Sequence, residues 1–267
     1  MLPREAEETV RVGQGVFHII YAPDDAGSAR RLVRALEEAL PVAERWATLS
    51  APVEIRVHPS HEALETATGL KRLPWVRAWA RPGTLDVQSP RTWSSGASEA
   101  DLRTLIAHEL THCVVYQATL GHRPGANDRM PLWFREGMAS VTAGEYHRSG
   151  YEALFRFYRD RDPARGGSGG ADPLSSPAPL MRSSSQFVYG TAHLAFQFLL
   201  DRAGEESVRG LILRMGEGLD FEEAFQTAMG LTVVEFEDEF RGYVEGRGWS
   251  GGGLSRRPGP SLPVGRG

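Results

Sequence analysis

Residues 98–120 read SEADLRTLIAHELTHCVVYQATL, and this stretch decides how the rest of the chain is interpreted. Its apolar residues recur at helical spacing, and Ser98 with Asp101 is typical of a helix N-terminus. On such a helix His108 and His112 differ by about 40° in direction and about 6 Å in rise, so both imidazoles lie on one side. The sequence therefore predicts one helix whose two histidines are able to bind the same metal ion.

Glu109 follows the first of these histidines and lies on the neighbouring flank of the helix, about 60° from His112. In that position a carboxylate reaches a water bound to the ion without being a ligand, which is the arrangement of a zinc site with a glutamate general base. The alternative is a pair of structural histidines beside a buried glutamate, but an unpartnered buried carboxylate costs several kcal/mol. The motif therefore favours a metal site.

The third protein ligand is expected on a following helix. Residues 131–140, PLWFREGMAS, begin with a proline suited to a first helical turn, and an antiparallel return brings Glu136 beside the two histidines. Gly137 beside it would allow close helix packing. A related class of zinc site needs glycine and histidine where this chain has Val115 and Ala118, which excludes that class. The competing ligands are His122, Asp128, Glu145 and His147.

The pattern on both sides of this helix predicts an α+β fold. Strands are expected at 15–21, 52–58 and 84–88 and helices at 27–49 (with Pro41 kinking or splitting it) and 60–69, whereas residues 1–14 and most of 75–90 are expected to be irregular. From residue 98 onward the pattern is helical, with helices expected at 98–120, 131–144, 150–160, 186–203, 205–216, 220–229 and 232–245.

These elements group into two lobes of one domain. Residues 15–97 form an N-terminal α/β lobe, and residues 98–246 form a helical lobe that carries the histidines. Within the second lobe, residues 160–185 are rich in Gly, Ser and Pro and are expected to be a flexible insertion, either a mobile loop or a lid. Residues 247–267 are expected to be a disordered tail.

Composition and charge limit the classes of partner. The 30 cationic and 34 anionic residues are well mixed and give a net charge of −4, which argues against nucleic acid. No apolar run approaches the ~20 residues that cross a membrane, and the acidic N-terminus lacks a secretion signal, so a cytoplasmic location is expected unless a signal was removed. The single cysteine, Cys113, excludes a disulfide framework. The oligomeric state is left open.

The motif His108-Glu109-x-x-His112, followed by Glu136 within Trp-Phe-x-Glu-Gly-Met-Ala, resembles the gluzincin metallopeptidases of the peptidase MA-like group. The run YGTAH at 189–193 is similar to the start of the helix that follows in these domains. The resemblance covers about residues 15–245, although the family's usual segment before this run is shorter. It implies a zincin-like fold in which the helix with the histidines lies between the two lobes.

The resemblance also implies a function. One Zn²⁺ per chain would be bound by His108, His112 and Glu136, and Glu109 would be the general base for hydrolysis of a peptide or protein substrate. Two other interpretations remain open. One is a peptidase-like binding module that keeps the metal site but has weak or no turnover, and the other is a purely structural metal site.

Stabilisation of the oxyanion and binding of the substrate are further expectations from the resemblance. Tyr189 would donate a hydrogen bond to the oxyanion, with His193 as the alternative. In zincin-type folds the edge of a sheet pairs with the extended substrate, and the strand at 84–88 would supply that edge.

Overall fold

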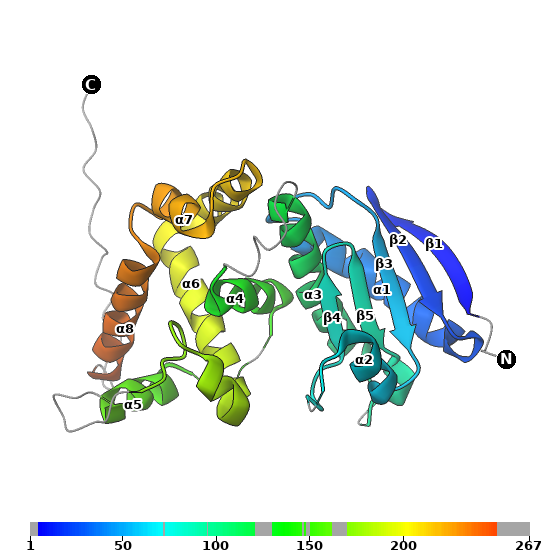
Figure 1. The fold of residues 1–267 in the computed structure, drawn as a ribbon, viewed down its shortest axis with the longest axis horizontal. Coiled ribbons are helices and arrows are strands. Elements are labelled where there is room, and N and C mark those ends of the chain that lie inside the picture. The colour runs from blue at the N-terminus through cyan, green and yellow to red at the C-terminus, as the bar shows by residue number, and fades with distance from the viewer. Residues whose placement is uncertain are drawn as a thin grey trace.

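Two groups of elements lie on either side of a central helix, α3 (Glu99–Leu120), in the computed structural model of the protein (Figure 1). The structure describes residues 5–71, 73–94, 96–120, 130–145, 147, 150–161 and 170–249. The group before α3 is built on a five-stranded sheet, and the group after it is built from helices. The fold is therefore α+β, as the sequence predicts.

The sheet has the strand order β1-β2-β3-β5-β4, in which the inner strands run parallel and the outer strands run antiparallel to their neighbours. The bounds are β1 (Ala6–Val12), β2 (Gly15–Tyr21), β3 (Val53–His58), β4 (Ala78–Arg81) and β5 (Thr84–Gln88). The three predicted strands are confirmed. The expectation of irregular structure at 1–14 and 75–83 is wrong, because β1 and β4 lie there. Both are outer strands with alternate exposed residues, so their apolar pattern is weak.

A tight turn at Pro82 and Gly83 pairs β4 with β5. Gly83 has a φ of 76°, a backbone conformation that glycine adopts readily in turns. Ala80 consequently lies opposite Leu85 in the antiparallel register. Because β5 is an inner strand, the expectation that residues 84–88 offer the free edge is wrong, and β4 is the edge strand on that side of the sheet.

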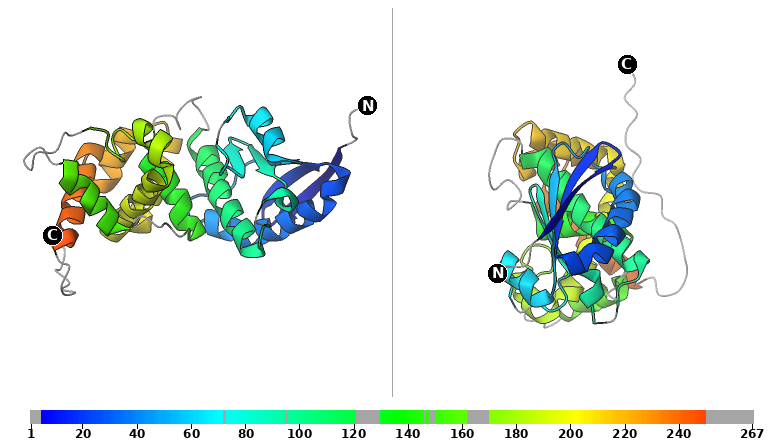
Figure 2. Two further views of the ribbon diagram at one scale, coloured as in Figure 1. Left: turned by 90° about the horizontal axis from the view of Figure 1, so that it is seen from below. Right: turned by 90° about the vertical axis from the view of Figure 1, so that its right-hand side faces the viewer.

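Helices cover both faces of the sheet. α1 (Ala26–Ala43) connects β2 to the parallel strand β3 and packs with α3 on one face, while α2 (His61–Thr68) lies beyond the opposite face (Figure 2). Inward residues of the strands, such as Phe17 and Ile55, form a core with Leu36 of α1 and Leu110 of α3. α1 contains Pro41 in its last turn and ends at Ala43, rather than at residue 49.

The second group of elements forms a separate hydrophobic core rich in aromatic residues. The helices of this group are α4 (Leu132–Ala143), α5 (Tyr151–Arg161), α6 (Ala178–Gly216), α7 (Phe221–Met229) and α8 (Val233–Trp249). α6 is interrupted by non-helical backbone at Ser184 and Gly204, and the second break confirms the predicted boundary between residues 203 and 205. None of the described helices combines the length and apolarity needed to cross a membrane.

Two segments expected to lack regular structure are partly helical. α6 begins at Ala178, so the end of the 160–185 segment is helix rather than loop, whereas residues 162–169 lie outside the described residues. α8 extends to Trp249, and the remainder of the expected tail also lies outside the described residues.

α3 is shared by the two cores. Its residues Ile106 and Leu110 belong to the core under the sheet, and Val115 near its end belongs to the helical core. The helix with the two histidines therefore lies at the junction of the two groups of elements, with α4 packed beside it (Figure 1).

Candidate metal centre

The histidine helix begins and is oriented as its sequence predicts. The Oγ of Ser98 accepts a hydrogen bond from the backbone N–H of Asp101, and the Asp101 carboxylate accepts one from the N–H of Ser98. The burial of Leu110 on the opposite face fixes the rotation of the helix. His108 and His112 consequently point to the same side, with ring centroids 4.9 Å apart and ring planes at 75°.

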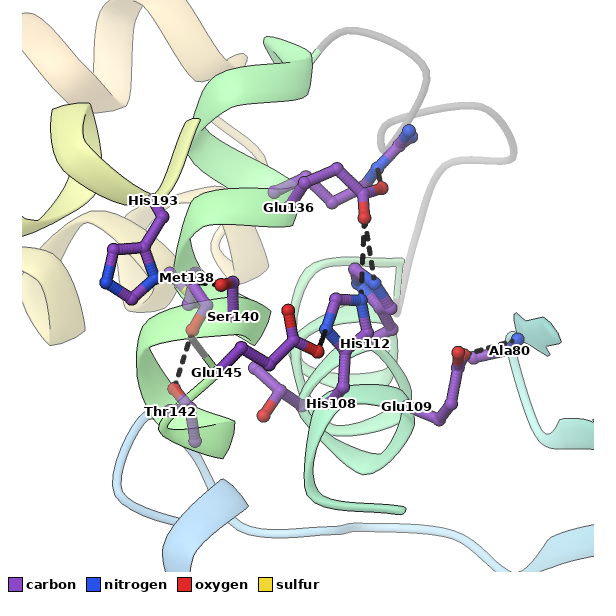
Figure 3. Close-up of polar contacts among 12 residues, drawn as sticks. Ala80, His108, Glu109, His112, Glu136, Met138, Ser140, Thr142, Glu145 and His193 are labelled. Carbon is purple, nitrogen blue, oxygen red and sulfur yellow. Dashed lines mark hydrogen bonds and ion pairs between the residues drawn. The ribbon is translucent and has the colours of Figure 1, made fainter. Parts of the chain in front are cut away.

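Glu136 of α4 approaches both imidazoles (Figure 3). Its Oε2 lies 3.5 Å from Nε2 of His108 and 3.7 Å from Nε2 of His112. The three residues form a cluster in which the ligand atoms lie within 4.8 Å of one another. Donor atoms bound at 2.0–2.1 Å to a tetrahedral zinc ion are about 3.4 Å apart, which is close to the two distances from Glu136.

The electrostatics of the cluster favour a cation. Burial opposes the charged imidazole of His108, yet Glu136 and Glu145 more than offset burial and hold the pKa of His108 well above its usual value. Burial likewise opposes the charge of Glu136, but the two imidazoles hold its pKa well below its usual value. A metal ion bound by these residues would have to displace the proton, because histidine binds a metal in its neutral form.

Gly137 explains how α4 reaches this position. A Cβ atom at Gly137 would lie 2.2 Å from the backbone oxygen of Ala192 and 2.7 Å from the Cβ of Phe196, both on α6. Only glycine allows α4 to approach α6 this closely. The close helix packing predicted for Gly137 is confirmed, and its partner is α6.

Glu109 lies outside the cluster, on the flank of α3 that faces the sheet (Figure 3). Its side chain is buried, and its Oε2 accepts a hydrogen bond of 2.9 Å from the backbone N–H of Ala80 in β4. Burial raises the pKa of Glu109, while the imidazoles of His108 and His112 act in the opposite direction. The carboxylate is thus held in one place and made more basic than an exposed glutamate.

Glu145, one of the competing ligands, does not join the cluster. Its Oε1 lies 2.8 Å from Nδ1 of His108, and its Oε2 lies 3.3 Å from Nε2 of His147. Burial opposes its charge, but the hydrogen bonds with His108 and His147 hold the pKa of Glu145 well below its usual range. A carboxylate on Nδ1 orients the ring so that Nε2 faces a metal. Glu145 directly follows Gly144, which ends α4 with a φ of 67°.

His193 and His147 both contact the hydroxyl of Ser140. The Oγ of Ser140 lies 2.6 Å from Nε2 of His147 and 2.8 Å from Nδ1 of His193. The two other competing ligands, His122 and Asp128, lie outside the described residues.

The cluster lies at the wall of a cleft of about 750 Å³. Tyr189 of α6 lines this cleft, whereas His193 is not among its described lining residues. Burial raises the pKa of Tyr189 well above its usual value, so its hydroxyl keeps its proton. Tyr116, which the sequence analysis did not single out, stacks on His112 with ring centroids 5.6 Å apart. The cleft is also lined by Trp75, Arg77, Trp79, Arg81 and Arg135.

The structure thus combines a mixed sheet, a helix with two aligned histidines and a carboxylate from the next helix, in a cluster that could hold a metal ion. Residues 93–246, more than half of the chain, match the family model of the Peptidase MA superfamily. The chain belongs to this superfamily, and the resemblance to gluzincin-like peptidases is confirmed. No curated protein sequence matches the chain.

Solved structures are similar to the chain at low sequence identity. Aminopeptidase A of Legionella pneumophila in complex with aspartic acid is 14% identical with a TM-score of 0.50, and the match covers 89% of this chain and 28% of that one. The M1 zinc metallopeptidase from Deinococcus radiodurans is 18% identical with a TM-score of 0.42, covering 97% and 54%. An aminopeptidase N family protein from Idiomarina loihiensis is 14% identical with a TM-score of 0.33, covering 90% and 41%. The chain therefore spans about half the length of these proteins or less.

Proposed function

We propose that this chain is a zinc-dependent metallopeptidase that hydrolyses peptide bonds and binds one zinc ion through His108, His112 and Glu136. The observation that carries the proposal is the cluster itself, whose three ligand atoms lie within 4.8 Å of one another at the wall of a cleft. When bound, zinc polarises the scissile carbonyl and lowers the pKa of a water molecule to about 7. Membership of the Peptidase MA superfamily supports the assignment.

Glu109 is the general base in this proposal. Its carboxylate accepts a proton from the attacking water and then donates that proton to the leaving amine. Two features support this role. Burial makes the carboxylate more basic, and the N–H of Ala80 holds one of its oxygens, so that the other remains for proton transfer.

Tyr189 is the proposed donor to the oxyanion. It lines the cleft with its hydroxyl protonated, whereas Nδ1 of His193 already has Ser140 as its partner. A hydroxyl placed where negative charge develops lowers the barrier because the transition state gains a hydrogen bond that the substrate lacks.

The edge strand β4 is the proposed binding site for the substrate backbone. β4 pairs with β5 on one side only, and its residues 78–81 line the cleft. An extended peptide adds to such an edge as a further strand. The hydrogen bond from the N–H of Ala80 to Glu109 supports this proposal, because it joins β4 to the proposed general base.

The test measures zinc content by mass spectrometry and turnover on a broad peptide library. We expect one zinc per chain in the wild type and in Glu109→Gln, loss of turnover in Glu109→Gln, and loss of zinc in Glu136→Ala. A Glu109→Gln variant as active as the wild type would refute the mechanism. Bound zinc without turnover on any peptide would instead favour a binding module.

A further inference from the structure

The charged groups of the cleft are unequally available to a substrate. Its described lining contains three carboxylates, and each has protein partners. Glu136 contacts the two imidazoles through Oε2 and accepts a hydrogen bond from Arg135 through Oε1. Glu145 contacts His108 and His147. Glu109 accepts a hydrogen bond from the N–H of Ala80. The cleft therefore has little negative charge left to bind an ammonium group of a substrate.

Arg135 is the cationic group closest in sequence to the metal cluster, and it lines the cleft with its side chain 24% exposed. Its Nε donates a hydrogen bond of 3.1 Å to Oε1 of Glu136. Among the described residues, none accepts a hydrogen bond from its two terminal nitrogens. A guanidinium carries five N–H donors, so four remain on the terminal nitrogens for a substrate.

The other two arginines of the cleft are less suited to bind a substrate near the metal cluster. Arg81 forms an ion pair with the buried carboxylate of Asp86. Arg77 donates to the backbone oxygens of Pro74 and Val76 in its own segment. Neither has a bond to the metal cluster, whereas Arg135 is bonded to Glu136.

We propose that Arg135 is a specificity-determining residue that binds a carboxylate of the substrate, so that peptides with an acidic group near the scissile bond are preferred. The carboxylate belongs either to an Asp or Glu side chain or to the C-terminus of the peptide. Two parallel N–H···O bonds from the terminal nitrogens match the geometry of either group. The inference rests on the proposed peptidase function, because it concerns the same cleft.

The experiment compares matched peptides that differ in one carboxylate. One series exchanges Glu for Gln at each position flanking the scissile bond, and the other exchanges a free C-terminus for an amide. In the wild type we expect kcat/KM to favour the acidic member on the order of tenfold to a hundredfold at one position, as hydrogen bonds to charged groups contribute. If the Glu/Gln series shows the preference, the carboxylate is a side chain, and if the amide series shows it, the carboxylate is the C-terminus of the peptide. A ratio near one at every position overturns the inference.

Arg135→Gln and Arg77→Gln form a matched pair of variants, because each removes one positive charge from the same cleft. We expect the preference to disappear in Arg135→Gln and to persist in Arg77→Gln. If Arg135 only supports Glu136, then Arg135→Gln lowers zinc content and slows both members of each pair equally, which contradicts the inference. If Arg135→Gln does not fold, Arg135→Lys replaces it, and the preference is expected to fall several-fold because lysine lacks the paired donors.

A binding measurement separates this inference from the proposed function. Zinc-loaded Glu109→Gln is titrated with the same peptides by calorimetry, alone and combined with Arg135→Gln. The inference is supported if the acidic peptide binds more tightly than its neutral counterpart and Arg135→Gln abolishes this difference. This holds even if the wild type cleaves no peptide. Equal binding of both members, or binding of neither, overturns it even if the wild type cleaves peptides.

Discussion

Replacement of Gly137 by alanine tests the packing that places Glu136. The new Cβ would lie 2.2 Å from the backbone oxygen of Ala192, and at least 0.8 Å of movement (3.0 − 2.2) is needed before the contact reaches 3.0 Å. The second contact, 2.7 Å, is with the Cβ of Phe196. Neither atom moves by side-chain rotation, so α4 and α6 must separate.

Two opposing effects determine how much Gly137→Ala changes the free energy of unfolding. Overpacking of a core costs about 1–3 kcal/mol, and the upper end applies because backbone atoms are involved. Alanine in a helix interior is about 1 kcal/mol better than glycine. The expected net loss in the free energy of unfolding is about 2 kcal/mol, which lowers Tm by about 4–8 °C in a chain of this size. Zinc affinity also falls, because Glu136 moves with α4.

Gly242→Ala is the matched control. Gly242 lies in α8, and a Cβ there meets no atom within 4 Å, so this variant is expected to gain up to about 1 kcal/mol. Chemical denaturation of both variants gives the free energy of unfolding, and titration with zinc gives the zinc affinity. If Gly137→Ala unfolds like the control and keeps wild-type zinc affinity, the packing argument fails.

Three further variants probe other contacts. Glu145→Gln keeps the shape of the side chain but removes the charge beside His108. Zinc affinity is therefore expected to fall about 10–100-fold in a competition titration. Unchanged affinity would show that Glu145 does not orient the imidazole of His108. Burial raises the pKa of Glu237 from its usual 4.5 to about 7, so the contribution of this group to the free energy of unfolding is full below pH 4.5 and declines as pH rises to about 7. Glu237→Gln is expected to flatten that pH dependence in denaturation experiments, and an unaltered curve contradicts the assignment. Ala80→Pro removes the N–H that holds Glu109, and kcat is expected to fall while zinc content is retained; loss of zinc would point to a wider distortion.

The helical elements and the metal cluster could be predicted from the sequence because both depend on local spacing. The period of α3 places His108 and His112 on one side, and Glu136 lies on the next helix, α4, beside both imidazoles. The break in α6 at Gly204 is likewise a local property, since glycine readily adopts the φ of 77° found there.

The missed features depend on contacts between segments distant in sequence. β4 is a strand of four residues that exists because β5 pairs with it, and its sequence, Ala-Trp-Ala-Arg, has little strand preference of its own. The hydrogen bond of Glu145 to His108 depends on the direction in which the chain leaves α4. Neither the partner strand nor that direction can be read from a short window of residues.

Because the hydrophobic interior is divided into two cores, an ion bound by the cluster would contact helices of both. His108 and His112 lie on the helix that completes the core under the sheet, while the helix of Glu136 contributes Trp133 and Phe134 to the other core. Because α3 already contributes to both cores, an ion bound between His112 and Glu136 would add a further link between them. Chelation is therefore expected to lower the melting temperature of a zinc-loaded sample.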